Sequence, residues 1–194
     1  MKYTRVPVDT FKKLVLNSGI ICTSFIPESR QVSGELWATT GSISFATNPE
    51  YVDFGEDVNN VPANTMQLKR LKSVDPTLSG TYVAIDTEAV RSMIGAADVS
   101  GSKINPRANL EIDDFKDIWF IADYSDVNVG ATAGHIAIHI KNALNTSGFQ
   151  LTTDKDSKGN IAFEYHGHYD LDDVDDLPFE VFVESGVAAA REAS

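Results

Sequence analysis

Residues 161–170 read IAFEYHGHYD, and this stretch decides the fold class. Its large apolar side chains recur at every second position, the pattern of a β-strand with one buried face. A helix would instead repeat its apolar residues at every third and fourth position. We therefore predict a strand that buries Ile161, Phe163, Tyr165 and Tyr169. Its opposite face would carry Ala162, Glu164, His166 and His168.

The same alternation recurs along the chain. Period-two patterns occupy residues 41–47, 77–85, 136–141 and 179–183, and residues 117–124 are more uniformly apolar. The polar turn DKDSKGN, residues 154–160, is typical of a hairpin between two such strands. The predicted fold is mainly β, an antiparallel β-barrel or β-sandwich with one packed α-helix and one long loop.

The helix is predicted at residues 86–95. Asp86 or Thr87 can cap its first turn, and Gly95 can end it. A second short helix is predicted at residues 11–16. The domain organisation that follows is an N-terminal arm with the first short elements at residues 1–33, a β-domain at 34–184 and a flexible tail at 185–194.

The long loop is predicted at residues 53–72, DFGEDVNNVPANTMQLKRLK, which show no sustained periodicity. Loops of this length in compact domains usually have a function or are disordered. Its beginning is acidic and its end is basic, a polarity suited to contact between copies of the chain stacked head to tail. The residues assigned to that contact are Asp53, Glu56, Asp57, Lys69, Arg70 and Lys72.

Charge and cysteine content narrow the function classes. The 194 residues carry a formal net charge of −12, which disfavours a nucleic-acid-binding surface. The single cysteine, Cys22, cannot form an internal disulfide, which suits a cytosolic environment. Charged residues interrupt any signal-peptide core, and no apolar run reaches the roughly 18 residues of a membrane helix. We expect an unexported chain that does not enter a membrane.

The residues with catalytic or metal-binding chemistry form no recognisable constellation. His166 and His168 could share a strand face, but a zinc site needs three or four converging ligands. His135 and His139 lack the glutamate of a helical zinc-protease motif, so all four histidines are interpreted as solvated or interfacial. Cys22 lies in a mostly apolar stretch, which predicts an inert core thiol. We therefore predict neither an enzyme nor a bound cofactor or metal.

The sequence also resembles a known family. Residues 38–71, ATTGSISFATNPEYVDFGEDVNNVPANTMQLKRL, are similar to the major tail tube proteins of siphophages that infect Gram-positive bacteria. That pattern is a glycine-bearing strand, a YxDFGED-like stretch, a proline and asparagine element and then ELKRL. The resemblance continues in order through LSGTYV (78–83), MIGAADV (93–99), DFKDIWFIADYSD (114–126), IAIHIKNALNTSGFQL (136–151) and FEYHGHYDLDDVDDLPFEVFV (163–183).

The resemblance covers residues 34–184, with departures at Val61, where a cysteine is frequent, and at Ala63, where a lysine is. It implies a structural virion protein that assembles into stacked hexameric rings, with strands of neighbouring subunits joined into one inner sheet. The partners implied are other copies of the chain and the tail terminator, tape measure and distal tail proteins. DNA would pass through without specific binding, and assembly would take place in the bacterial cytoplasm.

For such a tube, we expect Glu164, His166 and His168 to face the lumen, where a ring of carboxylates would repel DNA. Three alternatives stay open. The chain could be a monomeric acidic β-barrel binding module, a metal-assisted hydrolase, or the tube protein of a contractile phage or related injection system.

Overall fold

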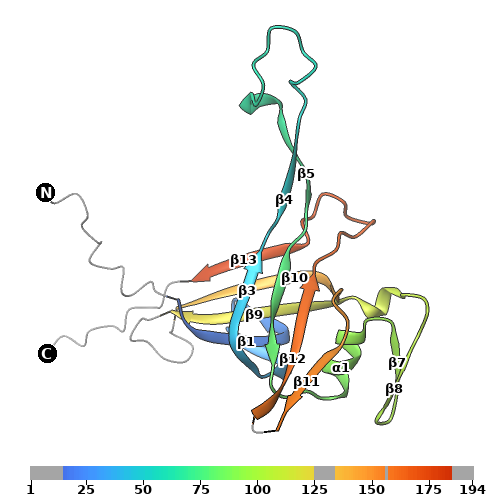
Figure 1. Cartoon of the computed structure of the whole chain (residues 1–194). Helices are drawn as coiled ribbons and strands as arrows, with labels where there is room; N and C mark the ends of the chain where they lie inside the picture. Colours follow the sequence, from blue (N-terminus) through green and yellow to red (C-terminus); the bar gives the residue numbers. More distant parts are fainter. Residues whose placement is uncertain (1–14, 125–133, 156, 185–194) are drawn as a thin grey trace, which may run out of the picture.

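The computed structural model of the chain describes residues 15–124, 134–155 and 157–184 (Figure 1). Within these residues the fold is mainly β, with one α-helix, as the sequence predicts. The strands are β1 (Val15–Ile26), β2 (Gln31–Trp37), β3 (Thr39–Ala46), β4 (Pro49–Asp53), β5 (Lys69–Val74), β6 (Thr77–Tyr82), β7 (Ala97–Ser100), β8 (Lys103–Pro106), β9 (Lys116–Tyr124), β10 (His135–Asn145), β11 (Gln150–Asp154), β12 (Ser157–His166) and β13 (Phe179–Glu184).

Nine strands form one antiparallel sheet that divides into two halves. Hydrogen bonds run in the order β2-β1-β9-β10-β12-β6-β3, with β13 paired to β10 and β11 paired to β12. The strand β10 joins the halves, because residues 135–143 pair with β9 while only Leu144 and Asn145 pair with β12. We call β2-β1-β9-β10-β13 the first half-sheet and β3-β6-β12-β11 the second half-sheet.

The core lies between the two half-sheets. One face of the first half-sheet contributes Ile21, Ile118, Ile138 and Ile140, and one face of the second contributes Leu78, Tyr82, Ile161, Phe163 and Tyr165. Aromatic rings pack against each other in this core: the Tyr82 ring stacks on the Phe163 ring with centroids 4.2 Å apart. The predicted alternation of residues 161–165 is confirmed, since Ile161, Phe163 and Tyr165 are all buried.

The helix α1 (Thr87–Ile94) lies where the sequence predicts it. The Asp86 carboxylate accepts a hydrogen bond from the Ala89 amide at 2.7 Å, which satisfies a free donor of the first turn. Gly95 ends the helix with φ of 81°, a conformation that favours glycine. The helix buries Ala89 and Met93 against the core, so it packs on the β-sandwich through one face only.

The segment predicted as a long loop is a β-hairpin arm (Figure 1). The strands β4 and β5 pair antiparallel from Pro49 with Val74 to Asp53 with Lys69, and the arm extends well away from the sandwich. The loop prediction for residues 53–72 is therefore wrong at both ends, because Asp53 and residues 69–72 belong to strands. Only residues 54–68 form the tip, which includes the 3-10 turn η2 (Met66–Leu68).

The N-terminal predictions also change. Val15 and Leu16 begin β1, so the helix predicted at residues 11–16 does not include them, and residues 11–14 lie outside the described residues. The strands β1 and β2 pair with each other and β1 with β9, so the domain boundary predicted at residue 34 falls inside β2. The predicted flexible tail, residues 185–194, lies outside the described residues.

Candidate functional site

The outer face of the second half-sheet, which we call the open face, carries small and polar side chains. Its strands alternate, so that core-facing residues of β12 are buried while Ala162 and Glu164 are exposed. Residues opposite each other in an antiparallel pair share a face. By that register the open face comprises Thr40, Ser44 and Ala46 of β3, Thr77, Ser79 and Thr81 of β6, Ala162, Glu164 and His166 of β12, and Gln150 of β11.

Glu164 lies near the centre of this face. It is opposite Ser79 on β6, and Ser79 is in turn opposite Ser44 on β3. The backbone amide of Glu164 donates to Asn145 Oδ1 at 2.8 Å, which fixes the strand where β10 and β12 meet. The carboxylate itself is about half exposed, at 48%. A single acidic side chain therefore stands above a floor of serine, threonine and alanine.

Glu164 belongs to a cluster of three residues with His166 and Asp75. His166 Nε2 lies 3.2 Å from Glu164 Oε1, and His166 Nδ1 lies 2.7 Å from Asp75 Oδ1. Burial opposes protonation of His166, but the hydrogen bonds to Asp75 and Glu164 outweigh it, and the pKa is raised above its ordinary value of 6.5. Protonated His166 offsets one of the two carboxylates, so the cluster becomes more negative as pH rises.

His168 does not join this cluster. The strand β12 ends at His166, and the Gly167 amide donates to the Pro76 carbonyl at 3.0 Å, so the alternation stops there. The His168 ring lies edge-on to Phe115 and its Nδ1 contacts the Asn142 carbonyl oxygen at 3.1 Å. Tyr169, predicted among the buried aromatics, is 40% exposed. The strand-face prediction therefore fails beyond residue 166.

The arm holds a second group of predicted site residues. Asp53 organises the tip, because its carboxylate accepts hydrogen bonds from the Gly55 and Asn64 amides at 2.8 and 2.6 Å. Lys72 pairs with Glu50 across the hairpin at 2.8 Å. Arg70 donates only to backbone carbonyls among the described residues, and Glu56 and Asp57 are exposed.

Apolar side chains accompany those charges on the arm. Tyr51 is 54% exposed, Phe54 63% and Met66 79%. Lys69 stays within the arm, bonded to Asn64 Oδ1 at 3.0 Å and lying over the Tyr51 ring at 5.6 Å from its centroid. Exposed apolar side chains beside an arginine that has no ion pair within the described part of the chain are suited to a protein contact. Of the six predicted contact residues, Glu56, Asp57 and Arg70 have charged groups available for one.

The outer face of the first half-sheet is different, because aromatic side chains close it. Cys22, Phe25, Trp119, Ile121 and Ala137 are buried there as a second apolar cluster. The His139 ring stacks on Trp119 with centroids 4.0 Å apart. His135 lies edge-on to Phe25 at 5.5 Å. Both histidines are buried, so the prediction that they are solvated or interfacial is wrong.

Cys22 has the environment predicted for it. The side chain is fully buried, and that burial raises the pKa of its thiol to about 11. The thiol is therefore protonated and unreactive near neutral pH.

Neither a metal centre nor a membrane span emerges from the described residues. Within them, no group of three or more His, Cys, Asp or Glu side chains is arranged to hold a metal ion. None of their helices is long and apolar enough to cross a membrane.

Sequence reasoning did not predict which residues of different strands come together on the open face. Ser44, Ser79 and Thr81 carry no distinctive motif, and Asp75 lies 91 residues from His166 in the chain. The only available signal was the alternation of short polar residues with apolar ones along each strand. Register between distant strands sets their neighbours, and it cannot be read from one strand alone.

No protein-family model matches this sequence, and no curated protein matches it either. The function is therefore inferred from the geometry of the open face and the arm, and from the resemblance of residues 34–184.

Proposed function

We propose that this chain is a structural subunit of a tail tube, in which copies form hexameric rings that stack around a channel for DNA. The resemblance to siphophage tail tube proteins is the origin of this proposal. The fold adds physical support from three features: the edges of the second half-sheet, the chemistry of its open face, and the arm.

One observation carries the proposal. The second half-sheet ends in β3 on one side and β11 on the other, and within the described residues β3 pairs only with β6 and β11 only with β12. Edge strands offer unpaired backbone groups to another chain. Contact between β3 of one copy and β11 of the next would be heterologous, and such contacts generate rings when the rotation closes.

Sheet extension of this kind would place the open face on one side of a continuous wall. Serine, threonine and alanine side chains are small, so they project little into a channel. They are also uncharged, so they offer no cationic group to hold phosphate. Glu164 would be repeated by every copy in the ring. The net charge of −12 acts in the same direction, since a negative wall repels DNA and lets it pass.

The arm would then make contact between stacked rings. It extends beyond the sandwich, so a contact there does not compete with the edges of the second half-sheet (Figure 1). Its exposed Phe54 and Met66 would supply apolar area, and Glu56, Asp57 and Arg70 would supply charge complementarity. The other partners would be the tail terminator, tape measure and distal tail proteins, in a virion assembled in the bacterial cytoplasm.

Size-exclusion chromatography with negative-stain electron microscopy tests the proposal. Rings or tubes from the purified chain, alone or after raising its concentration, are the expected result. A chain that remains monomeric under all assembly conditions would instead favour a β-barrel binding module. Contractile sheath proteins that bind the tubes would favour a contractile phage or related injection system.

Reversing charge on the arm tests its part in stacking. Replacing Lys69, Arg70 and Lys72 with glutamate should give a folded subunit that forms rings but not long tubes. The sharper variant is Arg70→Glu alone, because Lys72 also pairs with Glu50 inside the arm. Lys103→Glu, at the exposed β7–β8 hairpin, changes the net charge equally and should leave tube length unchanged. Equal tube lengths for Arg70→Glu and wild type would count against the assignment.

A further inference from the structure

The two half-sheets do not cover each other completely. Their strands cross, and the end of β13 extends past β3, the last strand of the second half-sheet on that side (Figure 1). On its other side the second half-sheet ends in β11, which pairs with β12. At both β13 and β11, apolar side chains on the core-facing side are left partly uncovered.

The end of β13 carries two such side chains. Val181 is opposite the buried Ile138 in the register, and Val183 follows two positions later, so both valines lie on the core-facing side of the sheet. Phe179, two positions before Val181, contacts Phe45 of β3, with ring centroids 5.9 Å apart. Beyond that contact Val181 is 45% exposed and Val183 is 59% exposed. The second half-sheet therefore covers the start of β13 but not its end.

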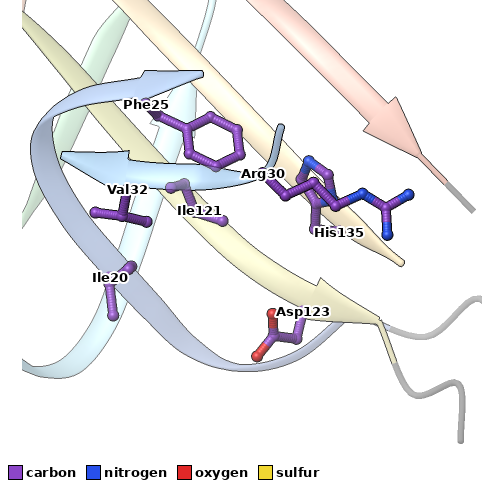
Figure 2. A pocket seen from close by; sticks show the side chains of 7 residues that line it. All are labelled: Ile20, Phe25, Arg30, Val32, Ile121, Asp123 and His135. Carbon is purple, nitrogen blue, oxygen red and sulfur yellow. The ribbon is translucent and has the colours of Figure 1, made fainter. Parts of the chain in front are cut away.

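The opposite side of the first half-sheet holds a cavity, which Figure 2 shows. Phe25 and Ile121 line it, and both belong to the apolar cluster of the outer face. His135 also lines it and is opposite Glu184, whose neighbour Val183 points to the other side of the sheet. The cavity and its ionisable residues are therefore separate from the exposed valines.

At the far edge of the second half-sheet, β11 carries a matching side chain. Leu151 is opposite Ile161 of β12, a residue of the core, so it lies on the core-facing side of its strand. It is 53% exposed, at an edge where no further strand pairs with β11 within the described residues. A core-facing leucine at one edge of the sandwich thus corresponds to uncovered core-facing valines at the other.

The ring contact proposed above would bring these two edges together. The second half-sheet is antiparallel throughout, so β11 runs opposite to β3. Copies related by rotation about an axis along these strands keep that relation, and β11 of one copy can extend the sheet at β3 of the next as an antiparallel strand. A continuous sheet keeps its faces, so Leu151 of the added strand would lie on the core-facing side, over the end of β13.

We propose that Leu151 of each copy packs against Val181 and Val183 of the next copy and completes a hydrophobic core shared by two subunits. The inference rests on the proposed function, because it needs the ring contact between β3 and β11.

This shared core would fix the register of the contact. Backbone pairing at a sheet edge allows several registers, whereas burial of one face of the strand specifies one. A slip by one residue would turn Leu151 to the open face and bring Thr152 to the core-facing side. The apolar contact therefore selects the pairing that also keeps the polar residues of β11 on the channel side.

Cysteine cross-linking between copies tests the shared core. A chain with Leu151→Cys is mixed with a tagged chain that carries Val181→Cys or Val183→Cys, and the assembled rings are oxidised mildly. The expected product is a disulfide-linked dimer that contains one chain of each kind. Cys22 should not contribute, because it is fully buried and that burial raises the pKa of its thiol to about 11.

A chain that carries both Leu151→Cys and Val181→Cys extends this test. Within one chain the two positions lie at opposite edges, and three strand spacings of about 4.8 Å separate β11 from β3. A disulfide needs Cα atoms within about 7 Å, so these cysteines should link only between chains. The expected result is a ladder of linked chains on a denaturing gel.

Charge substitutions test whether assembly needs this contact. Leu151→Asp should give a folded monomer that forms no rings, because its carboxylate would be buried without a partner. Val181→Asp should have the same effect from the other side of the contact. The matched control is Thr152→Asp, which makes the same charge change as Leu151→Asp on the open side of the same strand, opposite Asn160. It should form rings as the wild type does, and circular dichroism checks that every variant is folded.

The outcomes separate this inference from the proposed function. Wild-type chains that never form rings would overturn both. Rings that give no disulfide between position 151 and either valine position would overturn the shared core alone, and so would rings that tolerate Leu151→Asp. Disulfides between two Leu151→Cys chains would show that β11 contacts another β11, which would also overturn the inference.

Discussion

The two half-sheets share one core but differ in their outer faces. The first half-sheet covers its outer face with its own large side chains: Trp119 stacks on His139 and contacts Phe25, and Cys22 is fully buried. The second half-sheet has Ala162, Glu164, Ser79 and other small or polar residues on its outer face. The same architecture therefore produces one closed surface and one open surface.

This difference shows which surface is used for folding and which is left for other purposes. The closed face contributes apolar burial within a single chain. The open face buries little and has a free edge strand on each side within the described residues. Its small side chains contribute little burial to the stability of the isolated subunit. For this reason we assign them to a channel wall.

The largest expected effect is the difference in stability lost when a side chain is removed from the closed face or from the open face. Trp119→Ala removes a ring that contacts Phe25, His139 and Phe182, and should lower the free energy of unfolding by about 3–5 kcal/mol. Glu164→Ala, on the open face, should change it by less than about 1 kcal/mol, because exposed ion pairs contribute little. Urea denaturation measures both. Equal losses would mean that the open face is also a folding surface.

A smaller loss of stability distinguishes the core-facing side of β6 from its outward-facing side. Gly80 faces the core opposite Phe163, and a Cβ there would lie 2.7 Å from the Phe163 ring. Gly80→Ala should therefore destabilise the fold by about 1–3 kcal/mol through overpacking. The neighbouring Ser79→Ala, on the open face, should be nearly neutral. Thermal unfolding of the two variants would contradict the assigned faces if Ser79→Ala proved the more damaging.

The strands of the second half-sheet show how much the sequence could predict. Alternation in residues 161–165 identified the buried and outward faces correctly, because a sheet with one wet face imposes period two on its sequence. The helix was equally readable from Asp86 and Gly95, whose capping roles are local.

Other parts of the fold left no such pattern. The arm strands have solvent on both faces, since the successive residues 69–72 of β5 are all exposed, so no burial pattern distinguishes them from a loop. His139 is buried because the register places it opposite Trp119, a partner twenty residues away on another strand. Asp75 joins His166 by the same kind of long-range placement. These features depend on pairing between segments, which local periodicity does not encode.

A third prediction concerns charge on the open face and leaves stability almost unchanged. Glu164→Lys should alter the free energy of unfolding by no more than about 1 kcal/mol. Assembled tubes of this variant should retain DNA at low salt and release it as salt increases, whereas wild-type tubes retain none. Asp113→Lys makes the same charge change at an exposed residue of the turn η3 (Ile112–Asp114) and should behave like wild type. Equal retention by all three would remove Glu164 from the channel wall.

The smallest effect is a pH dependence centred on His166. Its pKa is raised in the folded state, so protonated His166 stabilises the fold fully below the unfolded value of about 6.5. That contribution, less than about 1 kcal/mol for so exposed a pair, is lost as pH rises through the higher native pKa. The stability difference between wild type and His166→Gln should therefore shrink from pH 6 to alkaline pH. A difference that grows over this range would contradict the sign.

The most direct test of the channel assignment is the distance between spin labels in assembled tubes. Labels would be placed at Glu164→Cys on the open face or at Leu36→Cys, which is opposite Cys22 on the outer face of the first half-sheet and 59% exposed. Cys22 should stay unlabelled near neutral pH, since burial raises the pKa of its thiol to about 11. In a sixfold ring, the separation of neighbouring labels equals their distance from the axis. We predict a clearly shorter separation at position 164 than at position 36; a shorter separation at position 36 would contradict the account.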